Sequence, residues 1–264
     1  MPSVLTWIIV ISMAFLGSAV WGLMQFYARR STLSHHMRMR FGIRSAIYFA
    51  GWWLAAVVLG ASGVFQTTSS SVFPAIAVGV TLPILMGILL LRRSASINSV
   101  LDAIPIQWLV GIQVYRAFGL IFLALYAAGH LPAEFAIPAG VGDVMVGVAA
   151  PVVGYLFYKG NRWSCLAVLG WNLAGIFDLV VAVAVGFLSS PGPFHTLAIE
   201  TPNELITAFP LVLVPVFAVP LSVVLHLATL KRLKSKFGTT VNDAHKWSRQ
   251  SLRCSIGCAL SAKL

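Results

Sequence analysis

The sequence is short of charged residues. Asp, Glu, Lys and Arg make up only 9% of its 264 residues, against about 25% in an ordinary soluble domain. Apolar residues account for 59%, and the mean hydropathy is +0.90. A soluble globule of this length needs more polar surface to cover its core. The composition therefore excludes a soluble enzyme, a disordered chain and a disulfide scaffold, and it predicts an integral membrane protein.

Residues that bind metals and cofactors are also scarce. The cysteines are Cys165, Cys254 and Cys258, and because no histidine follows the last two, their spacing does not make a metal site. A haem between helices usually needs two axial ligands, and only one histidine, His226, lies in an apolar run. The last run has no Lys for a retinal Schiff base. We therefore expect no metal and no cofactor.

Long apolar runs dominate what is present. They reach the length of about 20 residues that a helix needs to cross a bilayer, and they lack the period-2 alternation of strands. The sequence predicts an all-α fold, a polytopic bundle of seven transmembrane helices within residues 1–236, followed by a basic tail, residues 237–264. The helices are predicted at residues 4–27, 45–65, 73–91, 107–128, 139–158, 165–188 and 206–230.

The basic residues predict the orientation of the bundle. Of the 18 Lys and Arg residues, all but Arg116 fall on one side of the predicted membrane, in residues 28–44, 92–106, 159–164 and after residue 230. The other three connections hold no Lys or Arg. The positive-inside rule then predicts an outside N-terminus and a cytoplasmic C-terminus. Membrane insertion explains the net charge of +11, so we expect the lipid bilayer, and no nucleic acid, as a partner.

Arg116 and Asp178 are the first candidates for a site, because an ionisable group inside a bilayer costs about 2.5–3.5 kcal/mol or more. The rise of a helix places Arg116 near mid-membrane and Asp178 about 20 Å from the inner boundary. Because the long arginine stem can bridge that gap, the two are predicted to pair, with Asn172 as the alternative partner of Arg116. Gln113 lies three residues before Arg116 and shares its helical face. These residues are predicted to line one polar pocket. The alternative is that they only lock the helices together.

Asp143 is the third charged candidate and follows Gly140-x-Gly142 in the fifth run, about 6 Å below the outer boundary. Either the helix packs tightly and the carboxylate reaches outer water, or the acid lies at the mouth of an outward-facing pocket. The segment also resembles the Gly-x-Gly-Asp motif of intramembrane aspartyl proteases, in which two carboxylates share one proton. Asp178 is the only second carboxylate, and it follows the motif, whereas in that family it precedes it.

The last run adds His226 and three prolines spaced by five residues, each of which can kink a helix. His226 is predicted about 6 Å from the inner surface, as an interfacial, hydrogen-bonded side chain. Between the third and fourth runs, apolar residues at helical spacing predict a short surface helix. They are Ile97, Val100, Leu101 and Ile104.

Short segments between about residues 100 and 233 carry a family resemblance. They are Ile104-Pro-Ile-Gln-Trp108, Gln113-Val-Tyr-Arg116, Leu131-Pro-Ala-Glu-Phe135, Pro138-Ala-Gly-Val-Gly-Asp143, Trp171-Asn172, Asp178-Leu179 and Phe209-Pro-Leu-Val-Leu-Val-Pro215. Together they resemble an uncharacterised family of bacterial polytopic membrane proteins with seven helices. The resemblance implies that architecture and no activity, and residues 237–264 depart from it.

Three classes of function remain open. The leading hypothesis is a bacterial inner-membrane protein that binds a small polar or anionic molecule among helices four to seven, for transport or sensing, with Arg116 as the counter-charge. One alternative is an intramembrane enzyme that uses Asp143 and Asp178, and another is a scaffold that binds other membrane proteins. The candidate ligand-binding or polar-network residues are Gln113, Arg116, Asp143, Asn172, Asp178 and His226.

Overall fold

The described part of the chain is built of helices. The computed structural model describes residues 3–67, 75–160 and 162–235, and no strand occurs among them. The all-α fold class predicted from the sequence is confirmed. The long helices are α1 (Ser3–Ala28), α2 (His35–Ala61), α3 (Ala75–Arg93), α7 (Ala133–Tyr158), α8 (Ser164–Ser189) and the last helix (Val214–Ser235).

The fourth crossing consists of three consecutive helical segments. α5 (Ile106–Gly111) leads into a 3-10 helix (Ile112–Gly119), and α6 (Leu120–Ala127) completes the crossing. Counted as one, this crossing is among seven helices in the described residues that are long and apolar enough to span a membrane. By the length and composition of its helices, the chain is a multi-pass membrane protein. The short helix α4 (Ala95–Ala103) confirms the predicted surface helix.

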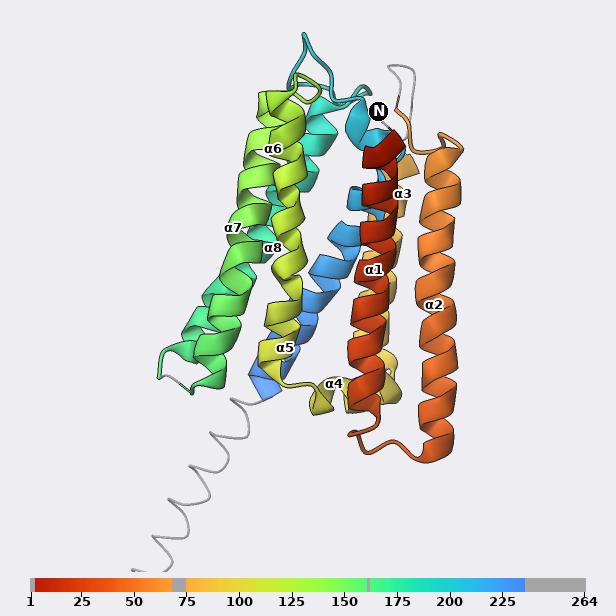
Figure 1. The fold of residues 1–264 in the computed structure, drawn as a ribbon, viewed down its shortest axis with the longest axis vertical. Helices are drawn as coiled ribbons and strands as arrows, with labels where there is room; N and C mark the ends of the chain where they lie inside the picture. Colours follow the sequence, from red (N-terminus) through yellow and green to blue (C-terminus); the bar gives the residue numbers. More distant parts are fainter. Residues whose placement is uncertain (1–2, 68–74, 161, 236–264) are drawn as a thin grey trace, which may run out of the picture.

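The helices form two groups with the last helix between them (Figure 1). In one group α7 packs against α8 and against all three segments of the fourth crossing. The other group holds α1, α2 and α3. The last helix crosses diagonally between the groups, and its π-helical segment, Val214–Ala218, contacts α1, α2 and α3. This position lets the last helix present side chains to both groups.

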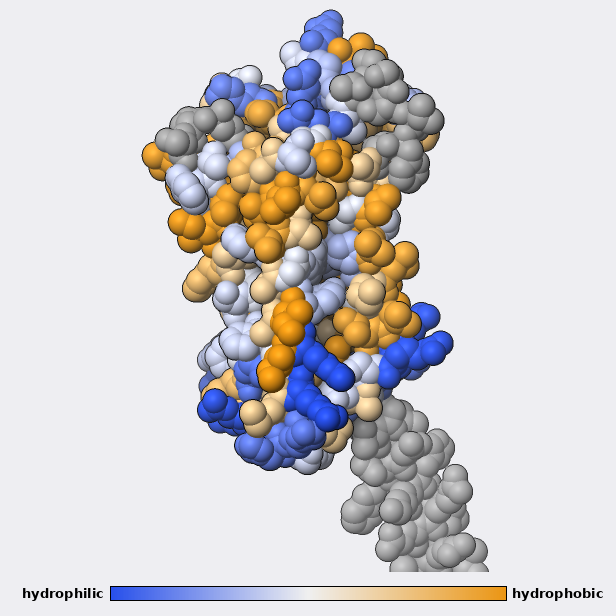
Figure 2. All heavy atoms as spheres, turned by 90° about the vertical axis from the view of Figure 1, so that its right-hand side faces the viewer, coloured by the Kyte–Doolittle hydropathy of each residue, from blue (hydrophilic) through white to orange (hydrophobic). Residues whose placement is uncertain are grey.

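The two ends of the bundle differ in charge. One end, which we call the basic end, carries Arg29, Arg92, Lys159 and Lys231, and the N-terminus lies at the other end (Figure 1). Figure 2 shows a broad apolar band between the ends and strongly hydrophilic side chains at the basic end. Such a band matches the hydrocarbon layer of a bilayer. The assignment of the basic end to the cytoplasm stays a prediction from the positive-inside rule.

Three helices begin six or more residues away from their predicted starts. α2 begins at His35 instead of residue 45, because Ser34 caps its first turn and the helix runs beyond the apolar run. α7 begins at Ala133 instead of residue 139, because Pro138 removes one amide donor without ending the helix. The last helix begins at Val214 instead of residue 206, because the chain first makes a separate 3-10 turn at Leu205–Thr207. The predicted tail and its two cysteines lie outside the described residues.

Candidate functional site

Arg116 lies in the interior of the bundle, on the 3-10 helix of the fourth crossing. A 3-10 helix has three residues per turn, so side chains three positions apart lie in line along one face. Gln113, Arg116 and Gly119 follow this spacing, and all three are buried. The 3-10 conformation therefore aligns an amide, a guanidinium and a glycine in one row, and α7 packs closely against this helix.

Two carboxylates share the Arg116 guanidinium. Arg116 Nε donates to Asp143 Oδ1 of α7 at 2.8 Å, and Arg116 Nη2 forms an ion pair with Asp178 Oδ2 of α8. Arg116 Nη1 donates to the carbonyl of Gly175 at 3.2 Å. Arg116 is only 3% exposed, so these protein groups replace nearly all of its hydration. The predicted pair of Arg116 with Asp178 is confirmed, and Asp143 joins it.

A histidine and an amide continue this chain of hydrogen bonds. Arg116 Nη1 lies 3.1 Å from His226 Nε2, and His226 Nδ1 lies 2.9 Å from Asn172 Oδ1. Because a guanidinium can only donate, Nε2 accepts, and the proton of a neutral imidazole lies on Nδ1 and is donated to Asn172. Asn172 Nδ2 donates to the carbonyl of Val168 at 2.7 Å. We call Arg116, Asp143, Asn172, Asp178 and His226 the ion cluster.

Glycines let α7 approach both neighbouring elements. A Cβ atom on Gly142 would overlap the Asp178 carboxylate, and one on Gly147 would overlap the Ala117 amide nitrogen and lie 2.8 Å from the Arg116 carbonyl carbon. Real Cβ atoms essentially never approach another atom within 3.0 Å. Small residues permit such close helix contacts in membranes. Since backbone atoms cannot swing aside, Gly147 sets how closely α7 lies to the 3-10 helix.

The charges of the ion cluster do not balance. With both carboxylates ionised and the His226 imidazole neutral, two negative charges face one guanidinium, and the formal charge of the cluster is −1. The side chains of Asp143 and Asp178 keep 15% and 11% exposure, against 1% for that of Arg116. A molecule that approaches the cluster meets carboxylate oxygens before it meets the guanidinium. This arrangement favours a cation or a hydrogen-bond donor over an anion.

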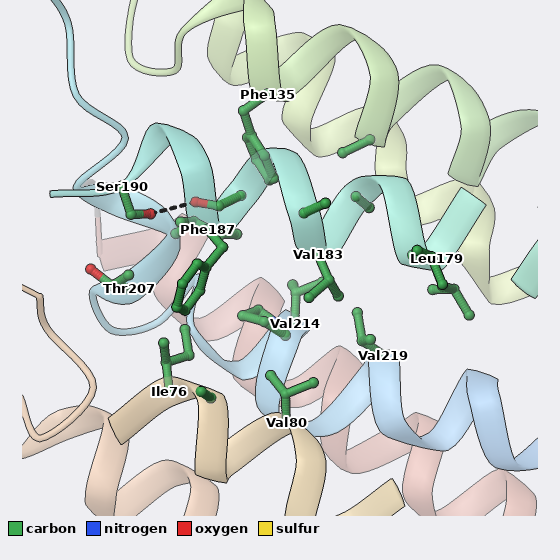
Figure 3. Close-up of a pocket in the computed structure, with 18 of the residues that line it drawn as sticks. Ile76, Val80, Phe135, Leu179, Val183, Phe187, Ser190, Thr207, Val214 and Val219 are labelled. Atoms are coloured by element: carbon green, nitrogen blue, oxygen red, sulfur yellow. Dashed lines mark hydrogen bonds between the residues drawn. The ribbon is translucent and has the colours of Figure 1, made fainter. Parts of the chain in front are cut away.

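An apolar cavity of about 620 Å³ lies beside the ion cluster, lined chiefly by α3, α8 and the last helix. Figure 3 shows Val183 and Phe187 of α8 and Ile76 and Val80 of α3 around this space. Ser190 and Thr207 lie together at one end of it (Figure 3), but their hydroxyls already donate to backbone carbonyls. The apolar cavity therefore has few polar groups free to meet a ligand.

Asp143 is the one charged residue among the described residues that line the apolar cavity. It also lines a small cavity of about 40 Å³, whose other polar walls include Arg116, Tyr115 and Ser222. A cavity of that size has room for about one water molecule. Asp143 thus lies between the apolar cavity and Arg116: it lines the cavity, and its Oδ1 accepts from Arg116 Nε.

The structure joins five of the six candidate residues and leaves Gln113 apart. Gln113 is fully buried, yet neither its amide nitrogen nor its oxygen has a hydrogen-bond partner among the described residues. Asn172, the predicted alternative partner of Arg116, reaches it only through His226. His226 is hydrogen-bonded as predicted, and its side chain is fully buried in the bundle. Because the last helix continues to Ser235, His226 lies about 14 Å from the end of its helix instead of about 6 Å.

Asp143 lies farther along its helix than predicted. Because α7 begins at Ala133, Asp143 lies about 15 Å along its helix instead of about 6 Å. The fourth crossing runs in the opposite direction, from the basic end, and Arg116 lies about 17 Å along it, so both residues are near the middle of the bundle. Beside the cluster, the Tyr115 hydroxyl hydrogen-bonds the Ser222 hydroxyl at 2.5 Å. The sequence analysis does not identify this pair, because no spacing or motif links the two residues.

Comparison with known proteins identifies the family. A family described as Domain of unknown function (DUF8737) matches residues 73–234, which is more than half of the chain. The chain belongs to the DUF8737 family. The matched region holds the whole ion cluster, whereas α1 and α2 precede it. No curated protein and no solved structure matches this DUF8737 protein, so its function is argued from the site.

Proposed function

We propose that this DUF8737 protein binds a small, mostly apolar organic cation in the apolar cavity, as a step in transport or sensing. The observation that carries the proposal is Asp143, a carboxylate in excess over the available guanidinium, at the wall of a cavity of about 620 Å³. Apolar cavities of about 300–1,000 Å³ with a few well-placed polar groups are typical small-molecule sites. The apolar part of the ligand would contact α3 and α8, and its charge would meet Asp143.

The charge of the ion cluster favours a different ligand from the anionic one considered from the sequence. An anionic ligand needs Arg116 as its counter-charge, but Arg116 Nε, Nη1 and Nη2 each have an acceptor already. An anion would have to displace a carboxylate from the guanidinium. A cation gains an attractive contact with Asp143 and leaves the Arg116 pairs in place. We therefore propose a cation in place of the anion.

The enzyme alternative fits the geometry less well. Two aspartates act as a protease dyad when they share a single proton, which requires the two carboxyl groups to lie together. Here Arg116 donates separately to Asp143 and to Asp178. The guanidinium thus takes the place that a shared proton would occupy, and we do not propose proteolysis.

The proposed location is the bacterial inner membrane, with the basic end in the cytoplasm. The resemblance to bacterial polytopic proteins and the separation of basic and non-basic connections support it. Because α8 begins near the basic end and ends at Ser189, the end of the apolar cavity that holds Ser190 and Thr207 lies toward the outside in this orientation. The apolar cavity would then receive its ligand from the outer half of the membrane.

A pair of ions of similar shape and opposite charge tests the proposal. We would titrate the purified full-length protein with tetraphenylphosphonium and, separately, with tetraphenylborate, and measure binding by isothermal calorimetry. We expect saturable binding of the phosphonium alone. Asp143→Asn should abolish it while Arg116 keeps its pair with Asp178. Equal binding of both ions, or phosphonium binding unchanged in Asp143→Asn, would overturn the proposal.

Two tryptophan variants separate the cavity from the lipid-facing surface. Val183→Trp places a large side chain in the wall of the apolar cavity and should weaken phosphonium binding at least tenfold. Val148→Trp adds the same side chain at an exposed position of α7 outside the cavity lining and should leave binding unchanged. Equal effects of the two substitutions would show that the ion binds elsewhere.

A further inference from the structure

A second cavity, of about 500 Å³, lies toward the basic end and shares no lining residue with the apolar cavity. Its walls come from α1, α2, α3, α4 and the last helix. They are mostly apolar, and the only charged residues among them are Arg40 and Arg44 of α2. α2 and α3 barely contact each other along their described lengths. We call this space the arginine-lined cavity.

The wall formed by α2 follows the polarity of one membrane leaflet. Arg40, Arg44, Tyr48 and Trp52 all line the arginine-lined cavity, and their spacing of four residues puts them on one face of the helix. The two arginines come first, then a tyrosine, then a tryptophan whose Nε1 donates to the Val216 carbonyl at 3.2 Å. Charged groups followed by amphipathic aromatics mark the passage from lipid headgroups to hydrocarbon.

The positive charges of the two arginines are not paired with other groups of the described residues. Arg40 and Arg44 are exposed, and neither forms a hydrogen bond or an ion pair with any residue that the structure describes. Ser94 and Ser96, at the N-terminus of α4, line the same cavity. A helix N-terminus carries a partial positive charge. Figure 2 shows strongly hydrophilic side chains directly beside apolar surface near the basic end of this face.

We infer that the arginine-lined cavity binds one anionic phospholipid from the leaflet at the basic end, with its phosphate on Arg40 and Arg44 and an acyl chain between α2 and α3. The apolar walls suit the chain, and the unpaired arginines suit the phosphate. The tail of this protein is a poor occupant, because it brings Lys246, Arg249 and Arg253 against two arginines. The inference is independent of the cation proposed for the apolar cavity.

Headgroup recognition is tested with two phospholipids that differ in charge. The full-length protein in detergent is titrated with dioleoyl phosphatidylglycerol or dioleoyl phosphatidylcholine, and bound lipid is counted by native mass spectrometry. We expect one tightly bound phosphatidylglycerol molecule. Its affinity should fall about 30-fold in the double variant Arg40→Gln, Arg44→Gln. The matched double variant Arg92→Gln, Arg93→Gln removes the same charge from the same end, outside the cavity lining, and should keep wild-type affinity.

Three results would overturn the inference. The first is equal binding of the two phospholipids, and the second is equal loss in both double variants, which indicates nonspecific attraction to a basic surface. The third is an affinity for inorganic phosphate that depends on Arg40 and Arg44 and matches that for the lipid, which indicates a soluble anion.

The acyl chain has its own matched pair of variants. Leu90 lines the arginine-lined cavity, whereas its neighbour Leu89 is 49% exposed and does not. Leu90→Trp should weaken phosphatidylglycerol binding at least tenfold, and Leu89→Trp should leave it unchanged. Equal binding by the two variants would show that no chain enters the space between α2 and α3.

Discussion

Replacing Arg116 with methionine removes the buried cation that two partly buried carboxylates share. The Arg116→Met variant leaves Asp143 and Asp178 facing each other without compensation, at 15% and 11% side-chain exposure. Breaking a buried ion pair by removing one partner costs about 3–5 kcal/mol. In a chain of this size that loss lowers the Tm by about 6–20 °C. The measurement is thermal unfolding of the purified protein in detergent.

Neutralising the carboxylates in turn should reverse the loss. Asp178→Asn alone keeps an amide oxygen as an acceptor for Arg116 Nη2 and leaves one cation with one anion, so it should cost less than about 1 kcal/mol. Arg116→Met with Asp178→Asn leaves one bare carboxylate and should recover part of the Tm. Adding Asp143→Asn leaves no charge and should recover most of it. A triple variant that is less stable than Arg116→Met alone would refute the reasoning, because the losses would then be independent.

Further predictions concern packing, the unpaired amide and the topology. Gly147→Ala pushes a methyl group into the backbone of the 3-10 helix and should cost about 1–3 kcal/mol in chemical denaturation. At Gly170 an added Cβ would have no atom within 4 Å, so Gly170→Ala should leave the free energy of unfolding unchanged or raise it by up to about 1 kcal/mol. Equal effects of Gly147→Ala and Gly170→Ala would argue against a close approach at Gly147. Gln113→Met should raise the free energy of unfolding by up to about 2 kcal/mol, because it removes a buried amide without partners, and a lower Tm would contradict that account. In a cysteine-free background, a membrane-impermeant maleimide added to intact cells should label Thr201→Cys and not Ala95→Cys, and the opposite pattern would reverse the orientation.

The fold could be predicted from the sequence because a bilayer demands long apolar helices. The runs are unmistakable, but their ends are not, since a helix can continue past the hydrocarbon layer. α2 does so through Arg40 and Arg44, and that extension puts both arginines on one helical face. α7 does so through Pro138, which directly precedes the predicted start at residue 139. An error of six residues there displaced Asp143 by about 9 Å in depth.

The site was predictable only in part. The cost of burying charge indicated that Arg116 and Asp178 pair, and the structure contains that pair. The contact of Asp143 with Arg116 depends on the start of α7 and on the close approach at Gly147, and neither is visible in the pattern of residues. The contact of His226 with Arg116 depends on the diagonal path of the last helix, which joins segments 110 residues apart in sequence. Local patterns do not encode such a crossing.

The 3-10 helix that carries Arg116 also affects the length of the fourth crossing. It rises about 2.0 Å per residue against about 1.5 Å in an α-helix, so the eight residues Ile112–Gly119 span about 4 Å more than the same residues in α conformation. In α conformation Gly119 would turn about 120° away from the face of Gln113, and it would leave Asp143, against which it packs. The Arg116 ion pairs thus form across the membrane-spanning bundle in a crossing that is about 4 Å longer than an unbroken α-helix of the same residues.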